Sequence, residues 1–417
     1  MKQEDIFLQP LFEPALASRH KAGSALQKVF TFSTVFGIFV LALLLLTIVN
    51  DSFGFVAVTN NIDPTTLVVD GVPFTDQTPQ QLQTIIKANL TKGKVRGLEK
   101  EKPLADRSQA DLSKLVGELV VEPKVDGTWT LIDSLLHKTQ IEQEVAAKYP
   151  GAILQFNSWL NLDFFSRAAS SDPLRAGVRT ALFGSLWTIA ITILFAFPIG
   201  VGAAIFLEEY TVDNAFYRLL KTNITNLAGV PSIIYGMLGL AIFVRGMQPI
   251  TSGAIFGGVE GDPAAATGRT ILSAGLTLSL LVLPLIIINA QEAIRAVSPL
   301  LRQASLGLGA TQWETIWHHV LPEAMPGILT GTILAISRAI GETAPLVVVG
   351  AATFITFDPS GPFSKFTTLP IQIYQWVARP QSEFRSLAAA AILVLMAMLL
   401  GLNAVAIYFR NRLQKRY

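Results

Sequence analysis

Arg338 and Glu342 are the residues whose type, spacing and surroundings point most directly to a function. They lie four residues apart in an apolar stretch that runs from Gly327 to Phe354. On a helix this spacing places both side chains on one face, where they can form an ion pair. A charged pair inside a membrane span is costly to insert, so it usually lines a solute path or binds a charged group. The planar guanidinium suits a tetrahedral oxyanion, and Glu342 is expected to keep Arg338 from holding an anion too tightly.

The residues next to this pair extend the candidate site. Thr343 offers a hydroxyl donor, and Gly341 and Pro345 are expected to weaken the helix so that backbone groups face a cavity. The sequence therefore predicts a substrate path at Arg338, Glu342 and Thr343. The alternative is an ion pair that only locks two helices together, since buried charged pairs are often no better than apolar packing for stability.

The composition places the chain in a membrane and excludes several classes of chemistry. Hydrophobic residues make up 51% of the chain and charged residues only 15%, against roughly 25% charged in an ordinary soluble domain. There is no cysteine, the four histidines show no metal-ligand spacing, and the net charge of +2 does not indicate nucleic-acid binding. No segment matches GxxxxGK[ST], so an ATP-hydrolysing partner must supply any energy. We expect a non-enzyme with no catalytic residues, no metal site and no cofactor.

Six apolar runs are long enough to cross about 30 Å of hydrocarbon as helices. They are Val29–Val49, Ala181–Leu207, Ile224–Val244, Ile271–Ile288, Ile328–Phe357 and Leu387–Phe409. The first run starts too late and is too long for a cleaved signal core, so it is expected to remain as an anchor. Lys and Arg residues precede the first run and follow the last, which predicts that both termini are cytoplasmic.

The spans divide the chain into segments with different compositions. The fold class predicted is an all-α polytopic membrane protein with six transmembrane helices and an α+β extracytoplasmic insertion after the first helix. The insertion carries 16 of the 30 acidic residues of the chain. The predicted segments are a cytoplasmic segment 1–28, the first transmembrane helix 29–49, the extracytoplasmic domain 50–179, a core 180–409 with five transmembrane helices and a cytoplasmic loop 291–322, and a cytoplasmic tail 410–417.

Local patterns in the insertion predict both strands and helices. Asp-Gly lies between strand-forming residues in 68–72 and in 125–129, which is typical of tight hairpins. Thr78 is expected to cap a helix that has Pro79 in its first turn and Gln81 at the capping-box position. The charged run 92–102 is interpreted as a solvated loop.

The cytoplasmic loop 291–322 is patterned as two short helices rather than as a linker. The first is expected to end at Leu308, Gly307 and Gly309 allow the turn, and Thr311 caps a second helix that runs to His319. An aromatic and aliphatic stripe at helical spacing then faces the cytoplasm or a partner, and two prolines end the helix and restart the next. The stripe is Trp313, Ile316, Trp317 and Val320, and the prolines are Pro322 and Pro326.

This loop resembles the EAA loop of the permease subunits of ATP-binding-cassette importers. The residues at the spacings of that pattern are Gln303-Ala304-Ser305, Gly309, His319 and Leu321-Pro322. Three of them depart from the pattern, since Gln303 replaces Glu, Ser305 replaces Ala and His319 replaces Ile. The resemblance implies that the loop docks into a groove of an ATPase subunit. It assigns this coupling role to Gln303, Ala304, Gly309, Trp313, Leu321 and Pro322.

Other segments are similar to one branch of that family, the PstA-type permeases of the bacterial phosphate-specific importer. The similar segments are 226–236, 304–311 and 338–345. The resemblance implies a permease for inorganic phosphate in the bacterial inner membrane. It implies as partners two ATPase subunits, a second phosphate permease subunit and an extracytoplasmic phosphate-binding protein. The insertion lies outside the pattern, so its role stays open.

Three alternatives remain beside this interpretation. The transported anion can be another oxyanion, such as sulfate or molybdate, because an arginine alone does not choose among them. The chain can also be a membrane-anchored sensor that uses its outer domain, although the coupling-loop spacing and the charged fifth span favour transport. The loop itself can be an amphipathic helix resting on lipid headgroups. For Asn226 and Tyr235 we favour hydrogen bonding between helices over contact with substrate.

Overall fold

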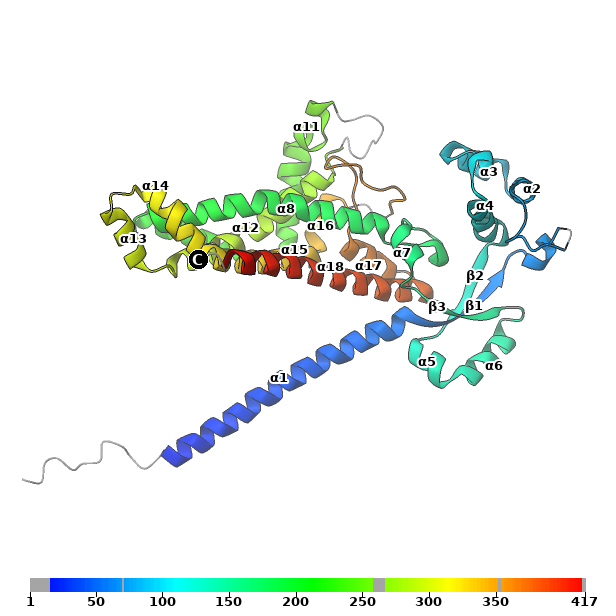
Figure 1. Ribbon diagram of the computed structural model, residues 1–417, viewed down its shortest axis with the longest axis horizontal. Coiled ribbons are helices and arrows are strands. Elements are labelled where there is room, and N and C mark those ends of the chain that lie inside the picture. The colour runs from blue at the N-terminus through cyan, green and yellow to red at the C-terminus, as the bar shows by residue number, and fades with distance from the viewer. Residues whose placement is uncertain (1–15, 70, 258–266, 352–353, 415–417) are drawn as a thin grey trace, which may run out of the picture.

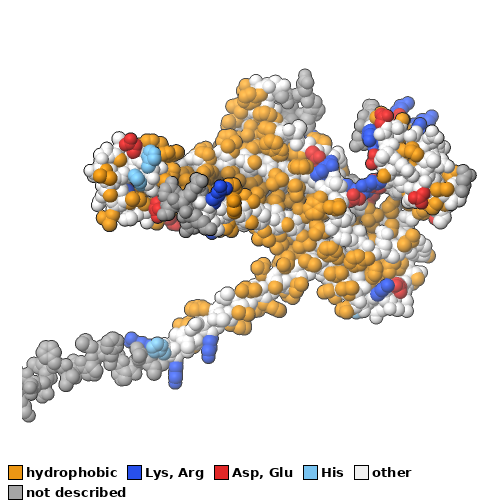
Figure 2. Space-filling model, viewed as in Figure 1, with side chains coloured by type: hydrophobic (Ala, Val, Ile, Leu, Met, Phe, Trp, Pro, Cys, Tyr) orange, Lys and Arg blue, Asp and Glu red, His pale blue; other side chains and the backbone are white. Residues whose placement is uncertain are grey.

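Long apolar helices form the core of the protein, and a smaller domain of helices and strands lies at one end of them (Figure 1). The computed structural model describes residues 16–69, 71–257, 267–351 and 354–414. Hydrophobic side chains cover most of the visible core surface, whereas charged groups gather on the small domain and at the opposite end (Figure 2). This distribution agrees with a core in lipid and two ends in water.

Five helices of the described chain are long and apolar enough to cross a membrane. They are α1 (Leu16–Ser52), α8 (Arg179–Ile205), α12 (Ile271–Arg295), α15 (Leu321–Gly341) and α18 (Ser382–Gln414). Helix α12 packs between α8 and α15, and α18 packs along α15. The predicted polytopic all-α core is therefore confirmed.

The third predicted span is a bent pair of helices. Helix α9 (Ala215–Ala228) and helix α10 (Ser232–Gly239), which continues in a π-helical turn to Gly246, meet at an angle of 104°. The bend falls where Pro231 lacks an N–H and restricts the residue before it. Counted as one span, this pair brings the number to six, as predicted.

The fifth predicted span, Ile328–Phe357, is wrong at both ends. Helix α15 ends at Gly341, and Glu342 is extended with φ −75° and ψ 122°. A six-residue helix, α16 (Ala344–Val349), follows and ends at Gly350, whose φ is 110°. Only a residue without Cβ adopts such an angle readily, so the chain turns there instead of continuing to Phe357.

Pro322 and Pro326 do not interrupt the helix as predicted. A π-helical turn over Ile316–Val320 leads directly into α15. Pro322 stands at the start of α15, directly after the π-helical turn, and the helix continues through it. Pro326 lies inside α15, and apolar membrane helices tolerate proline because neighbouring groups and local helix adjustments satisfy the freed carbonyl.

Helix α1 stands apart from the rest of the core (Figure 1). In its most apolar window no residue is buried within the chain, and its contacts with α18 lie near its outer end. Its apolar residues surround the helix on all sides, which suits a lipid environment. The predicted first span is thus a continuous helix from Leu16, and residues 1–15 of the predicted cytoplasmic segment lie outside the described chain.

The insertion between α1 and α8 is an α+β domain, as predicted. Its three-stranded antiparallel sheet has the order β2-β1-β3, and β1 follows α1 without a break. The strands are β1 (Phe53–Asn60), β2 (Pro123–Thr128) and β3 (Ile153–Ser158). The helices are α2 (Pro79–Asn89), α3 (Lys92–Glu101), α4 (Gln109–Val116), α5 (Leu131–Leu136), α6 (Lys138–Lys148) and α7 (Leu162–Ser166).

The local predictions for this domain have mixed outcomes. The capping box of Thr78 and Gln81 is present. Val69 and Val72 pair across a tight turn, with Asp70 outside the described residues. The other Asp-Gly pair forms no hairpin, because Asp126 is the extra residue of a bulge inside β2 and its carboxylate accepts a hydrogen bond from Thr59.

The charged run 92–102 is mostly helix α3 and not a loop. Its charged residues are good helix formers, and Val95 and Leu98 pack against the apolar cluster that α2 and α4 enclose. Two apolar residues in a run of charges were enough to hold this segment against the domain.

The sheet packs on the outer ends of the core helices. Val56 and Trp159 of the domain share one buried cluster with Trp376 of α17 (Leu369–Val377) and Phe384 of α18. These side chains are at most 4% exposed. The outer domain is therefore joined to the core by a hydrophobic interface as well as by two chain connections.

Candidate functional site

Two broken spans pack against each other at the candidate site. Helix α10 of the bent span lies on α16, and a Cβ placed on Gly236 would lie only 2.7 Å from the Cα of Pro345. Val230, at the bend, packs on the same buried cluster as Ala335 and Ala339 of α15. Non-helical backbone at membrane depth is tolerated where protein or a water-filled cavity surrounds it. Two such breaks side by side therefore indicate a functional region.

Arg338 and Glu342 lie at this junction. Arg338 is in the last turn of α15, and its Nε lies 3.5 Å from Oε1 of Glu342, the residue that ends the helix. The Arg338 side chain is 46% exposed within the chain and the Glu342 side chain 18%. The expectation that both residues lie within one helix is wrong, because the helix stops at Gly341; the Arg338 side chain is nearly half exposed, whereas Glu342 is mostly buried.

The Arg338 guanidinium keeps most of its donors available. It has five N–H donors, and within the described chain its hydrogen-bond partner is the single Glu342 oxygen. At 3.5 Å this contact is long for a charge-assisted hydrogen bond. The arrangement leaves a half-exposed cation that can accept an anion and that keeps a nearby carboxylate to offset its charge.

Thr343 completes the predicted trio without making a cap. It precedes α16, and its side chain forms no capping hydrogen bond there. Thr343 is half-buried and directly follows the extended backbone of Glu342. The structure therefore brings the three predicted path residues together at one helix break.

Tyr235 has a structural partner close to this site. Its ring is 3% exposed, and its hydroxyl donates to the carbonyl of Leu227 at 2.7 Å. The bond joins the two halves of the bent span across the bend. This contact agrees with the preference for hydrogen bonding over substrate contact, although the partner belongs to the same span rather than to another one.

The loop 291–322, which the sequence predicts to be cytoplasmic, has the expected helix–turn–helix form. Helix α13 (Pro299–Gly307) is followed by Gly309 at φ 91°, and Thr311 caps α14 (Gln312–Thr315) in a capping box with Glu314. The second helix does not stop at His319, because it runs on into α15. The loop is thus rigidly connected to the span that carries Arg338.

The predicted coupling residues divide by exposure. Gln303, Ala304, Gly309 and Trp313 are exposed, whereas Pro322 is half-buried and Leu321 is buried in the core cluster between α8, α12 and α15. Leu321 can therefore support the loop only from inside.

The aromatic stripe also divides between two faces of its helix. Trp313 and Trp317 stack with their ring centroids 5.5 Å apart and are 54% and 52% exposed, but Ile316 and Val320 are each 1% exposed. The prediction of one outward-facing stripe is right for the two tryptophans and wrong for the two aliphatic residues. An exposed tryptophan pair is a typical anchor for a protein partner.

Two ion pairs that the sequence analysis did not identify fasten this loop to the core. Arg302 of α13 contacts Glu209 at 2.8 Å, and Arg295 at the end of α12 contacts Glu208 at 2.7 Å. Both carboxylates lie in the π-helical turn (Phe206–Tyr210) that extends α8. The adjacent acidic residues at the end of an apolar run were the available signal, but nothing in the sequence pairs them with arginines about 90 positions later.

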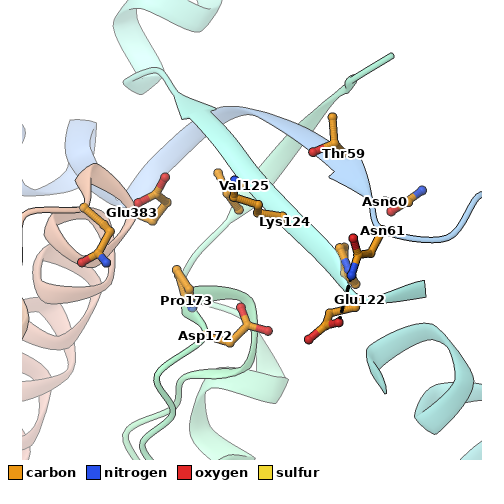
Figure 3. A pocket seen from close by; sticks show the side chains of 11 residues that line it. Thr59, Asn60, Asn61, Glu122, Lys124, Val125, Asp172, Pro173 and Glu383 are labelled. Atoms are coloured by element: carbon orange, nitrogen blue, oxygen red, sulfur yellow. Dashed lines mark hydrogen bonds between the residues drawn. The ribbon is translucent and has the colours of Figure 1, made fainter. Parts of the chain in front are cut away.

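A cleft of about 480 Å³ lies between the outer domain and the core, away from Arg338 (Figure 3). Carboxylates from three elements line it, namely Glu122 before β2, Asp172 and Glu383 of α18. Lys124 also lines the cleft, and Asp172 pairs with Arg175 at 3.1 Å, so the lining carries charges of both signs. Among the described residues no group of His, Cys, Asp and Glu has the arrangement of a metal site.

Comparison with known proteins identifies the family of the chain. The model of the family described as "Binding-protein-dependent transport system inner membrane component" matches residues 196–417, which is more than half of the chain. A probable ABC transporter permease of Bacillus subtilis, YqgI, is 31% identical over 263 residues, covering 59% of this chain and 83% of that protein. The phosphate transport system permease PstA of Mycobacterium leprae is 32% identical over 262 residues, covering 62% and 78%.

A second PstA protein and one solved structure show further similarity. The PstA protein of Haemophilus influenzae is 28% identical over 255 residues, covering 61% of this chain and 83% of that protein. A chain of the MetNI methionine ABC transporter, solved in inward-facing conformations, aligns with a TM-score of 0.40 at 20% identity, covering 59% of this chain and 99% of that chain. The matched segment contains the bent span, the cytoplasmic loop and the Arg338 junction. The chain belongs to the inner membrane components of binding-protein-dependent transport systems and is similar to their PstA-type permeases.

Proposed function

We propose that this chain is a permease subunit of an ATP-driven phosphate importer and that phosphate passes the junction of α15 and α16. The observation that carries the proposal is the half-exposed Arg338 beside a helix break, in a chain similar to several proteins named as phosphate permeases. A guanidinium offers parallel donors that fit the oxygens of phosphate.

The local geometry favours transient binding. Glu342 lies close enough to compete for the guanidinium, and its carboxylate repels an anion that stays. The Thr343 hydroxyl adds a neutral donor on the other side of the break. A site with one cation, one carboxylate and one hydroxyl lowers the free-energy barrier to passage of an anion without binding the anion tightly.

The cytoplasmic loop supplies the means of coupling to ATP. The exposed surface of Gln303, Ala304, Gly309 and Trp313 is a suitable contact for an ATPase subunit, and the second loop helix continues into α15. A displacement of the loop would therefore move the helix that ends at Arg338. The chain supplies part of the phosphate path and the helix that transmits movement of the loop, and it performs no covalent chemistry.

The assembly follows from this role. One chain lines only part of a path, so a second phosphate permease subunit would complete it. Two ATPase subunits would bind the cytoplasmic loops, and an extracytoplasmic binding protein would deliver phosphate. We place the chain in the bacterial inner membrane with both termini cytoplasmic, since basic residues flank the first and last spans.

Uptake of labelled phosphate by the complete transporter in proteoliposomes tests this proposal. Uptake should require internal ATP and the external binding protein, and unlabelled phosphate should compete while sulfate and molybdate should not. Competition by sulfate or molybdate at equal concentration would assign the path to another oxyanion. ATP hydrolysis stimulated by the binding protein without any anion uptake would instead favour a sensor.

A further inference from the structure

Helix α5 of the outer domain carries an apolar face that the protein leaves uncovered. Ile132, Leu135 and Leu136 are 54%, 71% and 72% exposed, and they recur at the spacing that gathers side chains on one helix face. Ser134 on the opposite face is 3% exposed. Isolated exposed aliphatic residues are ordinary, but three on two turns of one helix require a partner or a nonaqueous surface.

The position of α5 is fixed against the end of the first span. The backbone N–H of Ile132 donates to Oδ1 of Asn50 at 2.7 Å, and the backbone N–H of Phe55 donates to Oγ of Ser134 at 2.8 Å. These bonds tie both the start and the middle of α5 to the segment where α1 becomes β1. The helix therefore cannot move away from the end of α1 without losing them.

The depth of this attachment follows from the apolar run of α1. The apolar run Val29–Val49 contains 21 residues. As a helix, this run spans about 30 Å, which is the thickness of the hydrocarbon layer. Lys28 precedes the run and Asn50 follows it. Asn50 is thus at the outer boundary of the hydrocarbon, and α5, bonded to Asn50, lies at the same level.

The surroundings of α5 are lipid-facing on the side toward α1. Helix α1 has no buried residue in its apolar window, so that part of its surface is open to lipid, whereas its outer end contacts α18 and α5. Figure 1 shows α5 and α6 beside that end, to the side of the core, and Figure 2 shows hydrophobic side chains on this part of the domain. Lys138 follows the apolar face directly; its side chain is 62% exposed, and its Nζ lies 3.8 Å from a carboxylate oxygen of Glu142.

We infer that α5 is an interfacial membrane-binding helix, whose Ile132, Leu135 and Leu136 side chains insert into the outer leaflet of the membrane. The occupant of this face is lipid, because the face continues the lipid-exposed surface of α1 at the level of the headgroups. Insertion of this helix would hold the sheet, and with it the cleft between the outer domain and the core, at a fixed height above the bilayer. This inference rests on α1 crossing the membrane and is independent of the transported solute.

Site-directed fluorescence tests the inference in the full chain. The chain has no cysteine, so Leu135→Cys and Leu136→Cys each provide a single attachment point for an environment-sensitive dye. Leu41→Cys in α1 is the positive control for a lipid environment. Val68→Cys is the control for an aqueous environment, because Val68 is 42% exposed in the segment that precedes α2. The labelled proteins are placed in nanodiscs of phosphatidylethanolamine and phosphatidylglycerol, with or without a lipid that carries a quencher, near the headgroup for positions 135 and 136 and on the acyl chain for position 41.

The expected result is a blue-shifted emission at positions 135 and 136, with quenching by the labelled lipid and several-fold weaker quenching by iodide than at position 68. Emission and iodide quenching at 135 and 136 that match position 68 would overturn the inference, while lipid quenching at position 41 would leave the span of α1 intact. Protection from both quenchers would also overturn it, because a protein surface would then cover the face.

Discussion

Replacement of Arg302 by alanine should release the first helix of the cytoplasmic loop from the core. The guanidinium of Arg302 donates to Glu209 and to the backbone carbonyls of Ile294 and Val297 at the end of α12. Its side chain is 20% exposed and that of Glu209 only 9%. Arg302→Ala therefore removes the donors of two helix-terminal carbonyls and leaves a buried carboxylate without its cation.

The magnitude follows from burial. Removing one partner of a buried ion pair costs about 3–5 kcal/mol, and the partial exposure of Arg302 places the cost near the lower figure. A loss of about 3 kcal/mol raises the population of the released loop by roughly two orders of magnitude. The nearby pair of Arg295 and Glu208 is the matched control, because Arg295 is 52% exposed and such pairs contribute about 1 kcal/mol or less.

Hydrogen exchange of the full chain in nanodiscs measures the effect directly. Amides of α13 should exchange about a hundredfold faster in Arg302→Ala and no more than about fivefold faster in Arg295→Ala. Arg302→Lys keeps the positive charge but loses the planar guanidinium with its parallel donors, so its exchange rates should lie between those of the two alanine variants. Equal exchange in the two alanine variants would refute the claim that Arg302 fastens the loop.

Two glycine substitutions test other parts of the structure. Gly309→Ala should lower the free energy of unfolding by about 1–2 kcal/mol and speed amide exchange of the loop, because φ is 91° at this position. Gly307→Ala is the control, since an added Cβ there meets nothing within 4 Å, and it should leave amide exchange unchanged. Equal effects of the two substitutions would contradict the assigned turn. Gly236→Ala should lower the thermal midpoint through a loss of about 1–3 kcal/mol, because its Cβ would meet Pro345 at 2.7 Å. Gly341→Ala, with nothing within 4 Å, is its control, and a matching midpoint would disprove the close packing of the two breaks.

The sequence was sufficient for features that depend on composition or on neighbouring residues. Apolar length identified the spans, and the family resemblance of the loop is confirmed by the comparisons. The turn at Gly309 and the cap at Thr311 were also predicted, since both follow from local backbone preferences. The roles of the individual site residues remain predictions.

Features that depend on tertiary contact were missed. The end of α15 at Gly341 falls inside an apolar run whose hydropathy does not change, so length alone extended the helix to Phe357. The pairing of Arg302 with Glu209 joins positions 93 residues apart, which no local pattern reveals. Helix α5 has only six residues, too few for its exposed face to stand out from a strand or loop signal.

The most direct test of the central claim is ATP-driven phosphate uptake by the complete transporter carrying Arg338→Ala. Arg385→Ala, which removes an exposed arginine near the outer end of α18, serves as the control for the loss of a charge. We expect uptake to be lost in Arg338→Ala and retained in Arg385→Ala, while both variants assemble normally. Wild-type phosphate uptake by an assembled Arg338→Ala transporter would show that phosphate does not depend on Arg338 for its passage.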